Sequence, residues 1–185
     1  MGQGSYESVR IKILEAAECL QKGDYERALA SFFAAVELLP EDGHLARARL
    51  CSNIGHVLVR LQRYAEAVTY FGGALEIFVQ SGDVVCSAEQ LGNIGSVHRD
   101  TENWAASLDN YRKALTIFEE LGHKTGIADQ CSNIAFIRSR KGEVEEALRY
   151  FNKARDLYLE LGEDRKVGLC EKNLQAIEVL TKSWG

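Results

Sequence analysis

Proline is almost absent from this chain, which has only Pro40 among its 185 residues. Because proline lacks the N–H that a helix interior needs, its scarcity allows long uninterrupted helices. No apolar run reaches the roughly 18 residues of a membrane-spanning helix, and no charged-then-apolar leader of the secretory kind begins the chain. These absences predict a helical protein of the cytoplasm.

The sequence also lacks a basic block. Its 22 Lys and Arg residues stand against 27 Asp and Glu residues, for a formal net charge of −5. Proteins that bind nucleic acid use basic patches that neutralise phosphates, so neither nucleic acid nor an anionic membrane surface is expected as a partner. The hydrophobic content of 46% and the charged content of 26% are ordinary for a globular protein.

Motifs for metal binding and catalysis are missing as well. The five cysteines have no C-x-x-C pairing, and the four histidines lie at no finger-like spacing from them, so free thiols and no metal are expected. The chain has no phosphate loop, no H-E-x-x-H and no G-x-S-x-G. We therefore expect no enzyme, no catalytic residue and no cofactor. A catalytic function would need turnover that disappears when His56 is altered.

A repeat of about 40 residues organises the whole chain. The segment Leu91-Gly92-Asn93-Ile94-Gly95 has close copies 40 residues before and after it, at Cys51–Gly55 and Cys131–Ala135. Aromatic residues recur in the same register, and a small residue precedes each by four positions, which is one helical turn. These pairs are Ala28 and Phe32, Ala67 and Phe71, Ser107 and Tyr111, and Ala147 and Phe151. A fixed period of this kind is typical of a helical repeat array.

The repeated residues resemble the tetratricopeptide repeat family. That family places Gly or Ala on the first helix of a hairpin, as at Ala16, Gly55, Gly95 and Ala135, and an aromatic at the start of the second, as at Tyr25, Tyr64 and Trp104. Val144 departs from the pattern. The period is longer than the usual 34 residues, which makes the chain similar to the long-repeat branch that includes Pins-type spindle-orientation adaptors and kinesin light chains.

The resemblance implies an all-α, right-handed solenoid of four helical hairpins plus a C-terminal capping helix. We expect one domain over residues 1–185, with repeats at about 5–40, 43–80, 83–121 and 124–161 and the capping helix at about 164–182. Residues before the first helix are expected to form a disordered lead-in. Gly72-Gly73 falls inside a predicted helix, where close backbone contact or a soft spot would explain it.

The first helix of each hairpin would line the concave surface in this family. The predicted helix at 43–62 carries a polar stripe at helical spacing beside its packing positions. Of the residues in that stripe, only the asparagine recurs in the later repeats. A carboxamide can pair with both the C=O and the N–H of an extended peptide, and the resemblance implies this role for the asparagines. The alternative is that they fit the consensus and bond to a neighbouring repeat. The candidate peptide-binding residues are Asn53, Asn93, Asn133, Asn173, Ser52, His56, Arg60, Ser96, Arg99, Ser132, Phe136 and Arg140.

Charge along these helices predicts a basic and an acidic rim. Arg60, Arg99 and Arg140 lie toward the C-terminal ends of their helices, whereas Glu89 and Asp129 lie toward the beginnings. An acidic residue of a ligand could pair with the arginines; solvated surface charge is the competing interpretation. At the first repeat, apolar residues replace the polar stripe, so an apolar anchor, a sister subunit or the lead-in segment could bind there. They are Ile13, Leu14, Ala17 and Leu20.

The sequence therefore predicts an adaptor that holds an extended segment of another protein in its concave groove, and an acidic residue of that segment could pair with the arginines. A helix-in-groove mode with apolar anchors is the second possibility for the ligand. The alternative function is a self-associating scaffold that uses the apolar N-terminal surface or the outer helices.

Overall fold

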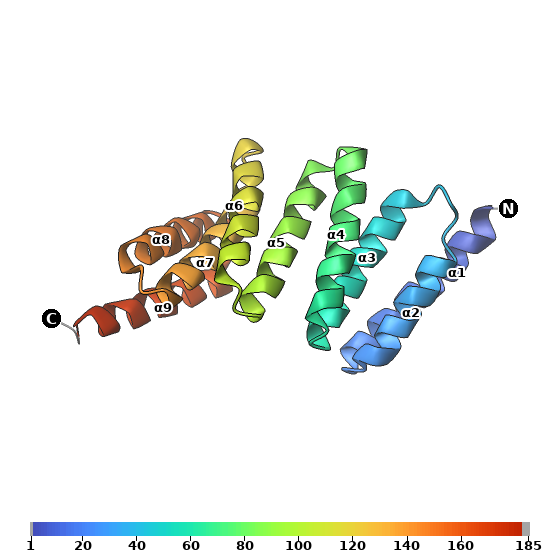
Figure 1. Ribbon diagram of the computed structural model, residues 1–185, viewed down its shortest axis with the longest axis horizontal. Helices are drawn as coiled ribbons and strands as arrows, with labels where there is room; N and C mark the ends of the chain where they lie inside the picture. The colour runs from blue at the N-terminus through green and yellow to red at the C-terminus, as the bar shows by residue number, and fades with distance from the viewer. Residues whose placement is uncertain (1, 183–185) are drawn as a thin grey trace. The chain divides into compact units, whose positions relative to one another are not determined.

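Within residues 2–182, the part described by the computed structural model, the structure consists of nine helices and no strand (Figure 1). The all-α prediction is thus confirmed. The helices are α1 (Gly2–Gln21), α2 (Tyr25–Glu37), α3 (His44–Arg60), α4 (Tyr64–Ser81), α5 (Val84–Asp100), α6 (Trp104–Glu120), α7 (Lys124–Arg140), α8 (Val144–Glu160) and α9 (Asp164–Lys182).

The chain divides into two compact units, and the division falls inside α5, between Val97 and His98. The first unit, called unit 1 below, contains α1–α4 and most of α5. Unit 2 contains the end of α5 and α6–α9. The single domain expected over residues 1–185 stays a prediction.

Turn chemistry explains where the helices end. Gly23 follows α1 with a φ of +75°, a left-handed conformation that favours glycine. Asp24 then caps α2, because its Oδ1 accepts a hydrogen bond from the backbone N–H of Arg27 at 3.2 Å. Glycine followed by aspartate is a sequence pattern that favours this end of one helix and start of the next. Gln62 and Glu102 hold the same left-handed region, with φ of +59° and +57°, although each carries a side chain.

Two helix boundaries differ from the prediction. α1 begins at Gly2, so residues 2–4 belong to the helix and not to a disordered lead-in; Met1 lies outside the described residues. α2 ends at Glu37, before the predicted end at Pro40. A proline disfavours helical backbone in the residue before it, which here is Leu39. The Leu39 side chain is buried and closes the core beneath this turn.

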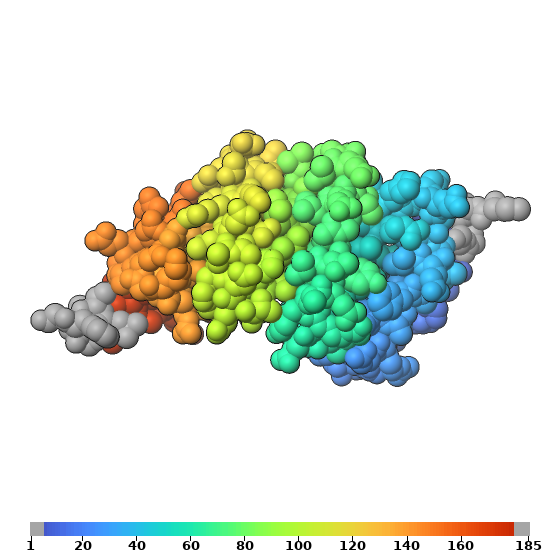
Figure 2. All heavy atoms as spheres, viewed as in Figure 1, coloured from blue at the N-terminus to red at the C-terminus, as the bar shows by residue number. Residues whose placement is uncertain are grey.

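The core of unit 1 is built by small residues that face aromatic rings. α3 and α4 lie side by side, and their atoms form one closely packed surface in Figure 2. Gly55 of α3 lies against Phe71 of α4, and a Cβ added at Gly55 would come within 2.6 Å of that ring. Ile54, Leu58 and Phe32 are buried in the same cluster. Gly55 and Phe71 both belong to the repeating positions of the sequence, and the structure packs them against each other.

Unit 2 repeats this arrangement around its own core. Tyr111, Phe151 and Tyr158 are buried with the small residues of α7 and α8, among them Ala135. Gly126, at the start of α7, makes a similarly close contact with the preceding hairpin, because a Cβ there would meet the Phe118 ring of α6 at 2.5 Å. The side chains of α9 that face this core are apolar at each helical turn. They pack the capping helix onto α8.

Gly72 and Gly73 do not make the close backbone contact that was one of the two explanations for them. A Cβ added at either position would meet no atom within 4 Å. Both lie inside α4, where glycine costs conformational entropy that alanine does not. Packing therefore gives no reason for glycine at these two positions.

Alanine substitutions should separate the two kinds of glycine. We expect Gly73→Ala to raise the free energy of unfolding by up to about 1 kcal/mol, because it removes a helix-interior glycine without a clash. Gly55→Ala should lower it by about 1–3 kcal/mol, since the Phe71 ring must move. Urea unfolding followed by circular dichroism measures both. Equal effects of the two substitutions would contradict this assignment.

Candidate functional site

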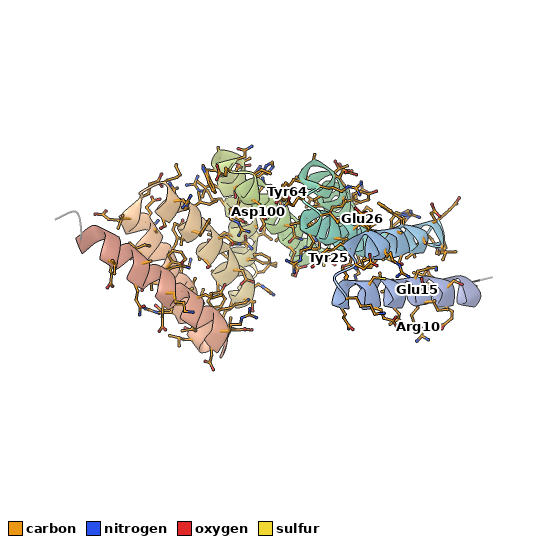
Figure 3. The ribbon with its side chains drawn as sticks, turned by 90° about the horizontal axis from the view of Figure 1, so that it is seen from below. Arg10, Glu15, Tyr25, Glu26, Tyr64 and Asp100 are labelled. Atoms are coloured by element: carbon orange, nitrogen blue, oxygen red, sulfur yellow. The ribbon has the colours of Figure 1, made fainter. Side chains whose placement is uncertain are left out.

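A pocket of about 380 Å³ opens in unit 1 where the first hairpin meets α3. Its apolar wall comes from α1, α2 and α3, and its polar rim comes from α3 alone. Tyr25, which is labelled in Figure 3, opens α2 at one side of it. The residues that line the pocket are Leu20, Tyr25, Phe32, Asn53, His56, Val57, Val59 and Arg60.

Three of the sequence-predicted site residues meet at this pocket because of their spacing on α3. Asn53, His56 and Arg60 follow one another by three and four residues, so they share one face of the helix. All three are exposed, whereas Ile54 and Leu58 on the opposite face are buried. Leu20, one of the apolar residues predicted to replace the polar stripe in the first repeat, lines the same pocket.

The polar groups of the pocket are available to a ligand. Within the described part of the chain, the Asn53 carboxamide makes no hydrogen bond and Arg60 forms no ion pair. The Arg60 guanidinium instead lies over the Tyr25 ring, 5.8 Å from its centroid. Such a cation–π contact holds the guanidinium in place without neutralising its charge.

His56 contributes a polar group whose protonation depends on its surroundings. Its ring meets the Phe71 ring edge-on, with 5.0 Å between the centroids. Although part of the side chain remains exposed, desolvation by the surrounding protein lowers the pKa of His56 below its ordinary value. The imidazole is therefore neutral near pH 7 and can both donate and accept a hydrogen bond.

Other predicted residues of unit 1 are engaged within the protein. The Ser52 hydroxyl donates to Oε1 of Gln90 at 2.9 Å, and the Asn93 carboxamide donates to the same oxygen at 3.4 Å. Ser96 donates to the carbonyl of Gly92, one turn earlier in its helix. Gln90, a buried residue that sequence reasoning missed, thus joins α3 to α5. Its only sequence signal is that Gln130 occurs 40 residues later.

In unit 2, the predicted residues Asn133 and Phe136 are brought together by Arg99. Its Nη1 donates to Oδ1 of Asn133 at 3.3 Å, and its guanidinium lies over the Phe136 ring at 6.0 Å. The same guanidinium pairs with Asp100 at 2.9 Å. Arg99 is therefore a neutralised, partly buried residue, and Phe136 remains exposed beside it.

The remaining predicted residues of unit 2 are less connected. Arg140 is exposed and forms no ion pair in the described part of the chain. Asn173 of α9 is half-buried, and its side chain makes no hydrogen bond with other described residues. Ser132 hydrogen-bonds to the Cys170 thiol, whose pKa is raised chiefly by burial.

One residue of the predicted acidic rim has a structural partner. Oδ1 of Asp129 accepts hydrogen bonds from the Tyr158 hydroxyl at 2.7 Å and from the Lys166 ammonium at 2.8 Å. Burial, and then the bond to Asp129, raise the pKa of Tyr158. Asp129 thus joins α7, α8 and α9, while Glu89 stays exposed on α5.

All five cysteines are free thiols. Cys131 and Cys170 are buried, whereas Cys19, Cys51 and Cys86 are half-buried. Over residues 2–182 no cluster of His, Cys, Asp and Glu is arranged to hold a metal ion. A search of the same residues found no helix that is both long enough and apolar enough to span a membrane.

Comparison with known proteins agrees with this fold. A family model described as tetratricopeptide repeat matches residues 45–120, which reach from the start of α3 to the end of α6. The comparison with curated proteins found no match.

Two solved structures share the fold at low sequence identity. The apo form of RapI superposes with a TM-score of 0.82 at 14% identity, covering 95% of this chain and 49% of that one. BtubC (BKLC) from P. vanneervenii superposes with a TM-score of 0.69 at 15% identity, covering 97% of this chain and 90% of that one. This chain thus spans about half the length of RapI.

These findings define the class of protein. The chain has an all-α fold of the tetratricopeptide-like helical solenoid class, and the tetratricopeptide repeat model matches residues 45–120 of it. The finer likeness to Pins-type adaptors and kinesin light chains stays a prediction.

The pH dependence of stability should report the His56 environment. Because the pKa of His56 is lower in the folded state than in the unfolded chain, the unfolded chain binds more protons between the two values. Stability should therefore fall as the pH decreases below about 6.5, the ordinary histidine pKa, and His56→Gln should remove that part of the decrease. Urea unfolding between about pH 7 and pH 5 measures it. His44→Gln, at an exposed position, is the control. An NMR midpoint for His56 above 6.5 would contradict the assignment.

Proposed function

We propose that this protein is an adaptor that binds an extended segment of a partner protein, and that the pocket of unit 1 anchors that segment. The observation that supports this most directly is that Asn53, His56 and Arg60 line the same pocket as the apolar residues of the first hairpin. The proposal includes a cytoplasmic location and no catalytic role.

Each group at the pocket suits a different part of a peptide. The unpaired Asn53 carboxamide can donate to a backbone carbonyl and accept from a backbone N–H. Arg60 can pair with a carboxylate of the ligand, since no carboxylate of the described chain neutralises it. Leu20, Phe32 and Val59 offer apolar contact for one side chain. Affinity should be moderate, because the segment must become ordered when it binds.

The other asparagines are weaker candidates than Asn53. To bind a peptide, Asn133 would have to give up the 3.3 Å hydrogen bond that it accepts from Arg99. Asn93 would have to give up the 3.4 Å hydrogen bond that it donates to Gln90. Both bonds are long, so the exchange costs little. Unit 2 also offers the exposed Phe136 and Arg140 beside Asn133. We therefore assign the main role to Asn53 and a supporting role to Asn133.

Peptide selection provides the test. A phage-displayed library of random extended peptides is selected on the native chain, and the affinity of the selected peptides is measured by calorimetry. Asn53→Ala should weaken binding about tenfold, the effect of losing hydrogen bonds worth about 1.4 kcal/mol. Arg60→Ala should weaken the binding of selected peptides that carry an acidic residue by a similar factor. It should leave the affinity for neutral peptides unchanged.

The control is Glu76→Gln, an exposed residue of α4 outside the pocket. It should leave the affinity unchanged, and circular dichroism should show that all variants fold. A ligand that binds as a helix on apolar anchors would instead lose affinity with Leu20→Ala and keep it with Asn53→Ala. Selected peptides that bind the Asn53→Ala/Arg60→Ala variant as tightly as the native chain would disprove a role for this pocket.

A further inference from the structure

Helix α1 exposes apolar residues at places where the other first helices are polar or covered. Leu14 is 56% exposed and occupies the repeat position of Asn53, Asn93 and Asn133. Ile11 is 48% exposed. The residues at its repeat position in α3, α5, α7 and α9 are all buried: Leu50, Gln90, Gln130 and Cys170. The outer surface of α1 is thus apolar at its centre.

Helix α9 shows the same substitution at the other end of the chain. Leu169 is 53% exposed and takes the place of Arg49, Glu89 and Asp129, which are charged in the earlier first helices. Val179 on the same face is 67% exposed. Both α1 and α9 therefore carry exposed leucine.

The exposed residues form one stripe on each helix. The α1 stripe consists of Glu7, Ile11, Leu14 and Glu18; the α9 stripe consists of Arg165, Leu169, Lys172, Ala176 and Val179. Successive members are separated by three or four residues in both, the spacing of a helix face that packs along a second helix.

The charges of the two stripes are opposite. Glu7 already pairs with Arg10, and Lys12 pairs with Glu15, both within α1; Arg10 and Glu15 are labelled in Figure 3. Glu18 forms no ion pair among the described residues, so the free charge of the α1 stripe is negative. Arg165 and Lys172 flank Leu169 and also form no ion pair there, so the α9 stripe is positive.

We propose that the chain associates with a second copy of itself, and that the α1 stripe of one copy packs along the α9 stripe of the other. Ile11 and Leu14 would cover Leu169, and Glu18 would lie opposite the basic residues beside it. The occupant is a second copy because the complementary stripe, apolar at its centre and opposite in charge, is present on this same chain. One pair of helices buries less than the roughly 1,200 Å² of a stable interface, so association should be weak and concentration-dependent.

A mixing experiment tests this pairing. Sedimentation velocity of the native chain between about 1 and 500 μM should show an apparent mass that rises with concentration. Leu14→Asp damages only the α1 stripe and Leu169→Asp only the α9 stripe, so each variant alone should stay monomeric. A mixture of the two should associate, because one copy supplies an intact α1 and the other an intact α9. The control Leu159→Asp, at an exposed position of α8, should behave as the native chain.

Charge reversal gives an independent measurement. Glu18→Lys, and separately Arg165→Glu with Lys172→Glu, should each weaken association about fivefold or more. The triple variant should recover most of the native affinity. Circular dichroism checks that each variant folds, as expected for substitutions at exposed positions.

Three results would overturn the proposal. One is a native chain that remains monomeric at the highest concentration. Another is association of either single aspartate variant alone, which would indicate α1–α1 or α9–α9 pairing. The third is a triple charge variant that associates no more tightly than the variants with only one stripe reversed. That result would show that the two stripes do not face each other.

Discussion

The close contact between a glycine on one helix and an aromatic ring on a neighbouring helix is the constraint on which both units depend. At Gly55 the Phe71 ring occupies the space that a side chain would take, and at Gly126 the Phe118 ring does the same. This close approach sets the distance between two helices. The Phe71 ring also meets the His56 ring edge-on, with 5.0 Å between the centroids, so the same packing positions one residue of the pocket.

Electrostatics divides the predicted site residues into two groups. Those of α3 that border the pocket have no partner in the described chain that satisfies them, whereas Arg99 and Asp129 are each held by several contacts. A polar side chain that already has its hydrogen bonds gains little from a ligand, because binding exchanges one bond for another. An unsatisfied carboxamide or guanidinium at the edge of an apolar pocket gains more. For this reason unit 1 is the stronger candidate for the site.

Most of the fold could be predicted from the sequence, because the repeat is a packing pattern that recurs four times. The period located every helix, and Gly23 and Asp24 fixed one turn through backbone conformation and capping. The site was predicted less well. Spacing on α3 indicates that Asn53 and His56 share a face. Spacing within one helix does not reveal hydrogen bonds to residues 34 to 38 positions away, such as those between Arg99 and Asn133 and between Gln90 and Ser52. Those partners depend on rotamers and on neighbouring repeats, which one sequence does not specify.

Gln62 and Glu102 lie in turns where the backbone is left-handed. Elsewhere in this chain, glycine adopts that conformation. A side chain in that conformation costs roughly 1 kcal/mol, so two of the connections between paired helices are strained. Both residues are exposed and neither borders the pocket. Glycine at either turn should therefore raise the stability of the protein without changing a residue that lines the pocket.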